Sequence, residues 1–300
     1  MSCPHHIAGM FNATARCLRK VRRARRFDRV RASKPLYIRV NDYWQDGLDA
    51  LWAYMAQGER WEKLQRHTRL AEKTITKALS DADRKLLMDL LSGYRYFDDV
   101  ETVAAAIVKA TRFDTFEAAA KFALGQLGIQ AADFELRNER IRDFLESRKS
   151  AEVMATRNHV DQVFETIMTN FYELGRNPFD KEFLEQLRKD LGYTSTYEAK
   201  RFALTETGIA SELAQVETFR RNGVVRKQWN ILGDNTRPTH AVLDGVQVEI
   251  DEKFYVGGYA ADHPLDPTLP AGELVNCHCW LSPVVDDDFQ IDPSRIWEGQ

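Results

Sequence analysis

The chain has 300 residues, of which 44% are hydrophobic and 29% are charged, and its formal net charge is −3. This composition is typical of a soluble globular protein and excludes an intrinsically disordered chain. No apolar run reaches the roughly 18 residues that span a bilayer, so we expect no membrane partner. Four cysteines do not make the disulfide framework of a small secreted protein, and the N-terminus has no apolar signal sequence. We therefore expect a protein that is made and used in a cytosol.

Basic residues crowd the N-terminus. Eleven lie between Arg16 and Arg39 against one acidic residue, Asp28, so this segment carries +10 and the remainder of the chain −13. A block of like charges repels itself and usually needs an anionic partner. We predict that residues 1–40 form a basic arm that binds double-stranded DNA or another acidic surface. The alternative is a solvated arm without a specific partner. The predicted tether residues are Arg16, Arg19, Lys20, Arg22, Arg23, Arg25, Arg26, Arg29 and Arg31.

From the arm to about residue 222, apolar residues recur at helical spacing. Residues 41–135 are predicted to form a helical domain. Its first helix is capped by Asn41-Asp42, another begins at Ser80-Asp81, and two shorter ones cover 103–110 and 116–127, the last ending at Gly128. We expect a long helix over about 133–174. A helix pair then follows at 179–191 and about 196–221, with a loop through Gly192 and a stop at Gly223.

From Val224 the apolar period changes from 3.6 to 2, which indicates strands near 225–231 and 246–250. A Gly/Pro-rich stretch over 257–272 leads to a last strand, predicted over 274–281. Residues 136–285 are thus predicted to form an α+β domain, in which a helical stem carries a small antiparallel sheet with long loops. Residues 286–300 form an acidic tail.

Glu206 falls on the apolar stripe of the last long helix, since it lies four residues after Phe202 and three before Ile209. A buried carboxylate costs several kcal/mol unless a cation or donors meet it. The segment from Asp234 to His240 supplies candidate partners, with Arg237 first and His240 second. One interpretation is a structural polar cluster of Glu206, Arg237, His240 and Asp234. The alternative is that Glu206 acts as a general base or a metal ligand.

Cys277 and Cys279 lie two residues apart. In a strand, such residues share a face at a Cα separation of about 6.6 Å, so both thiols can reach one zinc ion, while His278 points the other way. His240 and His263 would then complete the ligand set from other loops. The alternatives are two buried thiols that pack as small apolar groups, or a redox pair. We expect no required cofactor, with zinc as the alternative, and we predict that Cys277, Cys279 and His240 converge.

Taken together, the ordered series Thr205-Glu206, Asp234 to His240, Leu243-Asp244-Gly245 and Asn276-Cys277-His278-Cys279 resembles the phage head-morphogenesis family, the Mu F-like minor head proteins. The resemblance covers about residues 140–282. The sequence departs from the family pattern at Leu204 and at His278, where the family has Arg.

This resemblance implies a non-enzymatic virion protein of a tailed phage. It would lie inside the head, in the host cytoplasm during assembly, and would associate with portal and capsid proteins early in head assembly. The basic arm would then bind packaged double-stranded DNA or an acidic surface of the capsid or portal. The alternative is a nuclease or nucleotide-modifying enzyme that uses Glu206, Arg237 and His240, and a third hypothesis is a general DNA-binding module. An open cleft at these three residues would favour the enzyme, and a closed core would favour the structural protein.

Overall fold

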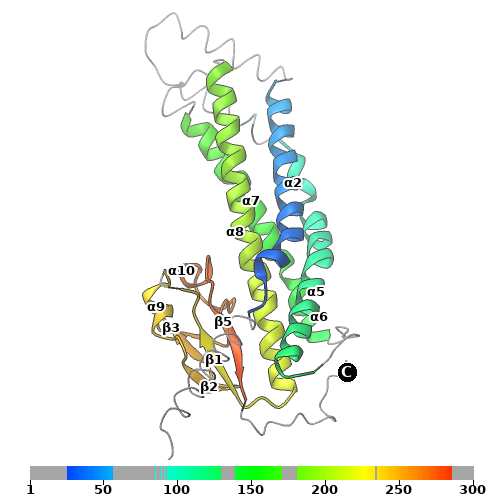
Figure 1. Ribbon diagram of the computed structural model, residues 1–300. Coiled ribbons are helices and arrows are strands. Elements are labelled where there is room, and N and C mark those ends of the chain that lie inside the picture. The colour runs from blue at the N-terminus through cyan, green and yellow to red at the C-terminus, as the bar shows by residue number, and fades with distance from the viewer. Residues whose placement is uncertain are drawn as a thin grey trace, which may run out of the picture. The chain divides into compact units, whose positions relative to one another are not determined.

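The computed structural model describes residues 26–56, 85, 89, 91, 93–129, 139–170, 181–233 and 235–285 (Figure 1). The chain divides into two compact units. The sheet unit comprises Met1–Ser33, Arg112–Glu139 and Leu204–Gln300, and the helical unit comprises Lys34–Thr111 and Arg140–Ala203. Each unit draws on segments that are far apart in the sequence. The domain limits predicted at residues 40, 135 and 285 follow chain order instead, and they stay a prediction.

The first described helix, α2, spans Arg29–Ala56. Asp28 caps it, because its carboxylate accepts a hydrogen bond of 3.0 Å from the backbone N–H of Arg31. The sequence predicted a start at Asn41-Asp42, which was wrong. The dense basic residues and Pro35 inside the helix concealed an apolar face that begins much earlier. Its buried residues are Leu36, Val40, Trp44, Leu48, Leu51 and Met55.

A short 3-10 turn over Tyr96–Asp99 leads into helix α5, Val100–Gln126. The sequence predicted two helices here, separated at Asp114-Thr115, and this prediction was wrong. Neither residue is a strong helix breaker, and no Gly or Pro interrupts the segment before Gly125. The predicted stop at Gly128 is confirmed, since this residue adopts a φ of +79° directly after the helix.

Two helices, α6 over Glu139–Ser147 and α7 over Lys149–Met168, replace most of the single helix predicted over 133–174. They are separated at Arg148, whose backbone N–H bonds to the carbonyl of Leu145, three residues earlier, at 3.2 Å. This tighter turn interrupts the α-helical ladder. The helix predicted from Ser80-Asp81 lies almost entirely outside the described residues, as do residues 130–138 and 171–180.

Helix α8 runs over Lys181–Arg221, through the loop that the sequence predicted at Gly192. A single Gly weakens a helix by about 1 kcal/mol relative to Ala but does not end it. The three hydroxyl residues that follow are also satisfied within the helix. Thr194, Ser195 and Thr196 donate to the carbonyls four residues earlier, at 3.0, 2.8 and 3.0 Å. The helix ends where Gly223 adopts a φ of +77°, as predicted.

The helical unit has a core of apolar side chains from α2, α5, α7 and α8. One cluster contains Leu48, Leu51, Met55, Leu91, Val163, Ile167, Leu187 and Leu191, and a second contains Leu36, Val40, Trp44, Ile107, Ala199 and Ala203. Inside this unit Trp44 stacks on the buried His159, with ring centroids 4.4 Å apart, and its Nε1–H donates to Thr156 at 3.0 Å. Apolar burial therefore provides most of the driving force for this unit.

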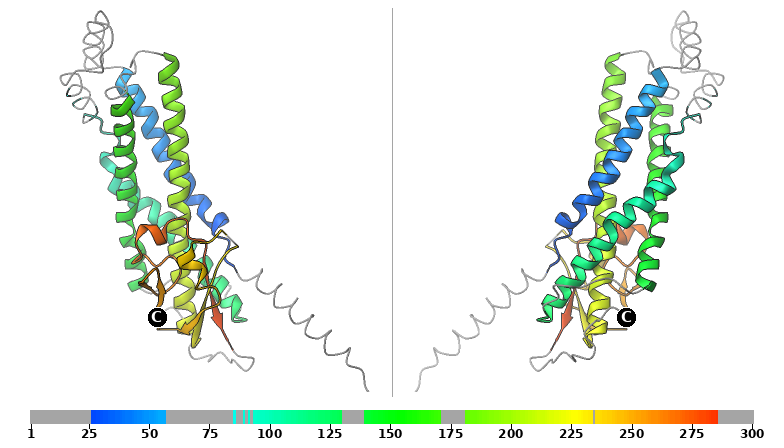
Figure 2. Two further views of the ribbon diagram at one scale, coloured as in Figure 1. Left: turned by 90° about the vertical axis from the view of Figure 1, so that its left-hand side faces the viewer. Right: turned by 90° about the vertical axis from the view of Figure 1, so that its right-hand side faces the viewer.

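The sheet unit contains a three-stranded antiparallel sheet in the order β2-β1-β5, formed by Gln247–Glu249, Arg226–Asn230 and Trp280–Val284. Figures 1 and 2 show β1 and β5 alongside the C-terminal part of α8, which belongs to the same unit. The predicted change of period at Val224 is confirmed. The last strand begins at Trp280, however, and not at Leu274, so Cys277 and Cys279 precede it.

The stretch over 257–272, predicted as long loops, contains further structure. A hairpin pairs β3, Phe254–Val256, with β4, Tyr259–Ala261, and its turn places Gly257 and Gly258 at positive φ. Two single-turn helices complete the unit, α9 over Pro238–Ala241 and α10 over Ala271–Leu274. The predicted α+β class is confirmed. Within the described part of the chain, no helix combines the length and the apolar character needed to cross a membrane.

Candidate functional site

The strongest candidate site lies in the sheet unit, where two short segments meet. Helix α9 begins with Pro238 at its first position, where a missing N–H costs nothing, and this places His240 in a buried position with 1% of its surface exposed. The second segment follows α10. There Asn276 adopts a φ of +58°, after which Cys277 and Cys279 are buried and His278 is exposed. The alternation predicted for a strand therefore holds in this extended segment, although it precedes β5.

Three potential ligand atoms converge between these segments. The Nδ1 atom of His240 lies 3.3 Å from Sγ of Cys279 and 3.5 Å from Sγ of Cys277. The three ligand atoms all lie within 4.8 Å of one another. Both cysteines are free thiols. The convergence expected from the sequence is thus present, whereas His263 does not belong to the group. His263 is buried, and its Nδ1 lies 2.8 Å from the carbonyl oxygen of Pro264.

Glu273 of α10 fixes the other side of the His240 ring. Its Oε2 lies 3.0 Å from Nε2 of His240 and accepts a 2.8 Å hydrogen bond from the hydroxyl of Thr239. The hairpin turn packs closely on this carboxylate, since a Cβ at Gly257 would lie 2.8 Å from Oε1. The imidazole is therefore held between a carboxylate on one nitrogen and two sulfurs on the other. No feature of the sequence distinguishes Glu273, which lies 33 residues from His240, from the other acidic residues, so its role was not predicted.

Arg237 holds the same two segments together. Its guanidinium donates to the backbone carbonyls of Glu273, at 3.3 Å, and Val275. The sequence predicted Arg237 as the partner of Glu206, and the structure instead places it on the end of α10. Asp234, the other loop residue of the predicted polar cluster, lies outside the described residues.

The pKa values of the two thiols are shifted in opposite directions. The hydrogen bond from Cys279, and then the imidazole of His240, lower the pKa of Cys277 against the opposing effect of burial. The same contact between the sulfurs, together with burial, raises the pKa of Cys279. Burial lowers the pKa of His240, but hydrogen bonds with Cys277 and Glu273 outweigh it and raise this pKa.

Glu206 is buried, as the sequence predicted, with 4% of its surface exposed. Its partner is different: the carboxylate lies 3.5 Å from the guanidinium of Arg112 on α5, which is itself buried. Both residues belong to the sheet unit. The predicted polar cluster therefore separates into two sites, one at Glu206 and Arg112 and one around His240.

A second buried pair joins Arg29 to Glu212 of α8. Arg29 also donates to the backbone carbonyl of Cys279 at 2.6 Å, and Glu212 accepts from the backbone N–H of Leu281 at 2.8 Å. Burial raises the pKa of Glu212, and the positive charge of Arg29 opposes this rise. This pair connects the start of α2, the middle of α8 and the segment that carries the cysteines.

The pair corrects the predicted role of Arg29. The sequence placed it in the DNA or capsid tether, but it is 4% exposed and bound inside the sheet unit. Arg31 is exposed and Arg26 is partly buried. The other predicted tether residues lie outside the described part of the chain: Arg16, Arg19, Lys20, Arg22, Arg23 and Arg25.

A buried lysine of the sheet unit was also not predicted from the sequence. Lys227 of β1 is fully buried, lies 5.6 Å from the centroid of the Phe254 ring, and forms an ion pair with Asp262. Asp262 also accepts from Arg220 at 3.2 Å. In the alternating pattern of β1, Lys227 lies on the same face as Trp229. This alternation was the one feature of the sequence that could have indicated the burial of Lys227.

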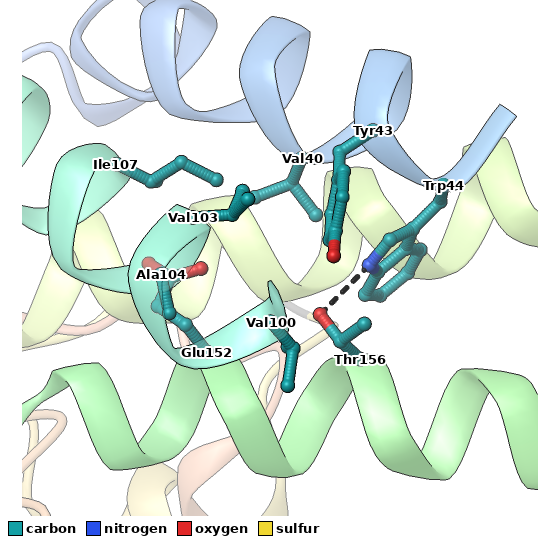
Figure 3. A pocket seen from close by; sticks show the side chains of 9 residues that line it. All are labelled: Val40, Tyr43, Trp44, Val100, Val103, Ala104, Ile107, Glu152 and Thr156. Atoms are coloured by element: carbon teal, nitrogen blue, oxygen red, sulfur yellow. Dashed lines mark hydrogen bonds between the residues drawn. The ribbon is translucent and has the colours of Figure 1, made fainter. Parts of the chain in front are cut away.

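The helical unit has a pocket between α2, α5 and α7 (Figure 3). Its lining is mostly apolar, and the hydrogen bond from Trp44 to Thr156 runs along it. One acidic side chain, the buried Glu152, lies among these residues. The side chains leave no room for a water-sized guest, so we interpret the pocket as a packing feature of the core.

The C-terminal part of the chain is similar to a known protein family. Residues 175–282 match the family of Phage Mu protein F like proteins, which confirms the resemblance noted in the sequence. The matched segment contains all of α8, His240, Glu273 and both cysteines of the site.

Two curated relatives are similar over part of their length. The chain is 38% identical over 146 residues to the uncharacterized protein YqbB of Bacillus subtilis, covering 47% of this chain and 46% of that protein. It is 36% identical over 94 residues to the NAD(+)–arginine ADP-ribosyltransferase EFV of Enterococcus faecalis, covering 30% of this chain and 19% of that protein. The chain thus spans less than half the length of either relative. No solved structure matches it.

Proposed function

We propose that this chain is a minor head protein of a tailed phage, which associates with portal and capsid proteins during head assembly and remains inside the head. The observation that carries this proposal is the match of residues 175–282 to the Phage Mu protein F like family. The match covers the part of the chain in which most of the buried polar contacts of the sheet unit lie.

The geometry of these contacts supports a structural role. Glu206 and His240 are 4% and 1% exposed, so a substrate could reach neither without opening the core. Glu206 is paired with Arg112, and His240 lies between Glu273 and two sulfurs. Residues that are enclosed and paired in this way hold elements together, whereas a catalytic base needs access to the reacting atom.

The basic arm gives the proposal a second part. Between Arg16 and Arg25 lie six basic residues and no acidic one. We propose that they bind packaged double-stranded DNA through its phosphates or an acidic surface of the portal or capsid. For six phosphate contacts, log K would fall with log salt concentration at a slope of roughly −5.

A pulldown from disassembled heads tests both parts. The full chain and a variant without residues 1–25 are compared, each with and without nuclease treatment. We expect both to recover portal or coat protein, and the full chain alone to retain DNA in a salt-dependent manner. A matched control replaces the six basic residues by Gln and keeps the length of the arm. Recovery of neither portal nor coat protein by the full chain would contradict the proposal.

The alternative is an enzyme that uses Glu206, Arg237 and His240, and the partial match to an ADP-ribosyltransferase gives it one supporting observation. Assays for nuclease activity and for NAD+ consumption distinguish the two functions. We expect no turnover by the full chain above that of the Glu206→Gln variant. Turnover that this substitution abolishes, in a protein that still melts cooperatively, would favour the enzyme.

A further inference from the structure

The group formed by His240, Cys277 and Cys279 has the chemistry of a transition-metal site. Two thiol sulfurs and one imidazole nitrogen are the donors that zinc prefers in proteins. They come from two segments, one before β2 and one before β5, and all three residues are buried. We propose that these three side chains bind one zinc ion, which joins the segment before β5 to helix α9.

The distances fit a single ion. With Zn–S bonds of about 2.3 Å and Zn–N bonds of about 2.0–2.1 Å, a tetrahedral site places its N and S ligands roughly 3.6 Å apart. The observed separations of Nδ1 from the two sulfurs are 3.3 and 3.5 Å. Only small adjustments of side chains would therefore be needed to admit the ion, and the backbone can stay in place.

The orientation of His240 is a second, independent observation. Its Nδ1 faces both sulfurs, while its Nε2 bonds to the carboxylate of Glu273. Histidines that bind zinc usually donate their other ring N–H to a carboxylate or carbonyl, which fixes the tautomer and the ring. Glu273 lies on the far side of the ring from the sulfurs, so it acts as a positioning residue and not as a ligand.

The surroundings support the same assignment. Arg29 donates to the carbonyl of Cys279 and holds the cysteine segment in place, and Arg237 holds the end of α10. Two thiols that merely packed as apolar groups would not require an imidazole nitrogen directed between them. Three protein ligands leave the fourth tetrahedral position for water or another small ligand.

Metal analysis of the full chain, purified without a histidine tag under reducing conditions, tests the proposal. We expect about one zinc ion per chain by mass spectrometry. After chelation, cobalt should restore the site and give an absorption spectrum with sulfur-to-metal charge transfer and tetrahedral d–d bands. X-ray absorption at the zinc edge should show two sulfur ligands. These measurements use the wild-type chain, so they do not depend on whether a variant folds.

Variants assign the ligands. Cys277→Ser and Cys279→Ser should each lose most of the bound metal. Any cobalt that these variants still bind should show the charge-transfer intensity of one sulfur instead of two. The double variant Cys3→Ser/Cys17→Ser is the matched control and should keep both. His263→Gln should also keep the metal, since His263 is outside the group. Glu273→Gln should keep the stoichiometry and weaken binding about 10–100-fold.

Three results would overturn the proposal. One is wild-type protein that contains no zinc and gives no charge-transfer band with cobalt. Another is metal that remains after both Cys277 and Cys279 are replaced. The third is a Cys277–Cys279 disulfide in protein kept under reducing conditions, because the sulfurs would then be unavailable as thiolates.

Discussion

The guanidinium of Arg112 on α5 lies 3.5 Å from the carboxylate of Glu206 on α8, and their side chains are 1% and 5% exposed. These residues are 94 positions apart in the sequence. The pair resembles the one between Arg29 and Glu212, which lies six residues further along α8 than Glu206. Two buried Arg–Glu contacts therefore tie other segments of the sheet unit to this helix. Removing one member of such a pair leaves an uncompensated buried charge.

We therefore expect Glu206→Ala to lower the free energy of unfolding by about 3–5 kcal/mol, measured by chemical denaturation. Replacing both partners, as in Arg112→Met/Glu206→Met, should cost less than the single change, because no charge is then stranded. Glu185→Ala, at an exposed position of the same helix, is the control and should change stability little. A Glu206→Ala protein that melts normally would contradict the structural role of this residue.

Because Arg29 is buried, a truncation that removes the basic arm must end before this residue. Deleting residues 1–39, the arm as the sequence delimits it, would remove Arg29 and leave the buried Glu212 without this partner. We expect deletion of residues 1–25 to leave the unfolding transition unchanged. Deletion of residues 1–39 should destabilise the protein by more than about 3–5 kcal/mol, because it strands Glu212 and also removes the buried Leu36. Equal melting of the two truncated proteins would refute the importance of the Arg29–Glu212 pair.

His159 gives the helical unit a specific dependence on pH. Burial lowers its pKa from 6.5 to about 4, while its ring stacks on Trp44 and its Nε2 lies 3.3 Å from the hydroxyl of Ser195. The unfolded state therefore binds a proton between these two pH values and the folded state does not. We expect the stability contributed by neutral His159 to be fully present above pH 6.5 and to fall by about 3 kcal/mol as the pH drops to 4.

Denaturation of the wild type and of His159→Phe across this range measures the effect. Phe keeps a ring against Trp44 but cannot bind a proton, so the variant should lose less stability on acidification than the wild type. An identical slope in both proteins would show that other groups cause the acid sensitivity.

Gly208 of α8 marks a close approach in the sheet unit. A Cβ at this position would lie 2.4 Å from Cδ1 of Leu265, which is buried and has a φ of +61°. We expect Gly208→Ala to destabilise the protein by about 1–3 kcal/mol, because the buried leucine has little room to move. Gly125→Ala on α5 is the matched control. A Cβ built at Gly125 would have none of the counted heavy atoms within 4 Å, so thermal melting of this variant should show no loss of stability.

Features that depend on local sequence could be predicted. The change of period at Val224, the stop at Gly223 and the burial of Glu206 all follow from short-range patterns. The meeting of His240 with Cys277 and Cys279 followed from the small core of a sheet with long loops, which needs polar contacts to hold its last strand.

Features that depend on tertiary contacts could not be predicted. Arg29 was one of eleven basic residues between Arg16 and Arg39, and nothing local distinguishes the one that is buried. Arg112 and Glu273 were likewise ordinary charged residues until the fold brought them to Glu206 and His240. Gly192 was interpreted as a loop because single glycines often end helices, whereas the hydroxyls of Thr194, Ser195 and Thr196 are satisfied inside α8.

The central claim is that this chain is a structural component of a phage head. Quantitative mass spectrometry of purified proheads and DNA-filled heads tests it most directly. We expect the chain in both particles at a fixed ratio to the portal protein, retained through high-salt washing of the empty particles. Its absence from both, with all of the protein in the unassembled fraction of the lysate, would contradict the claim.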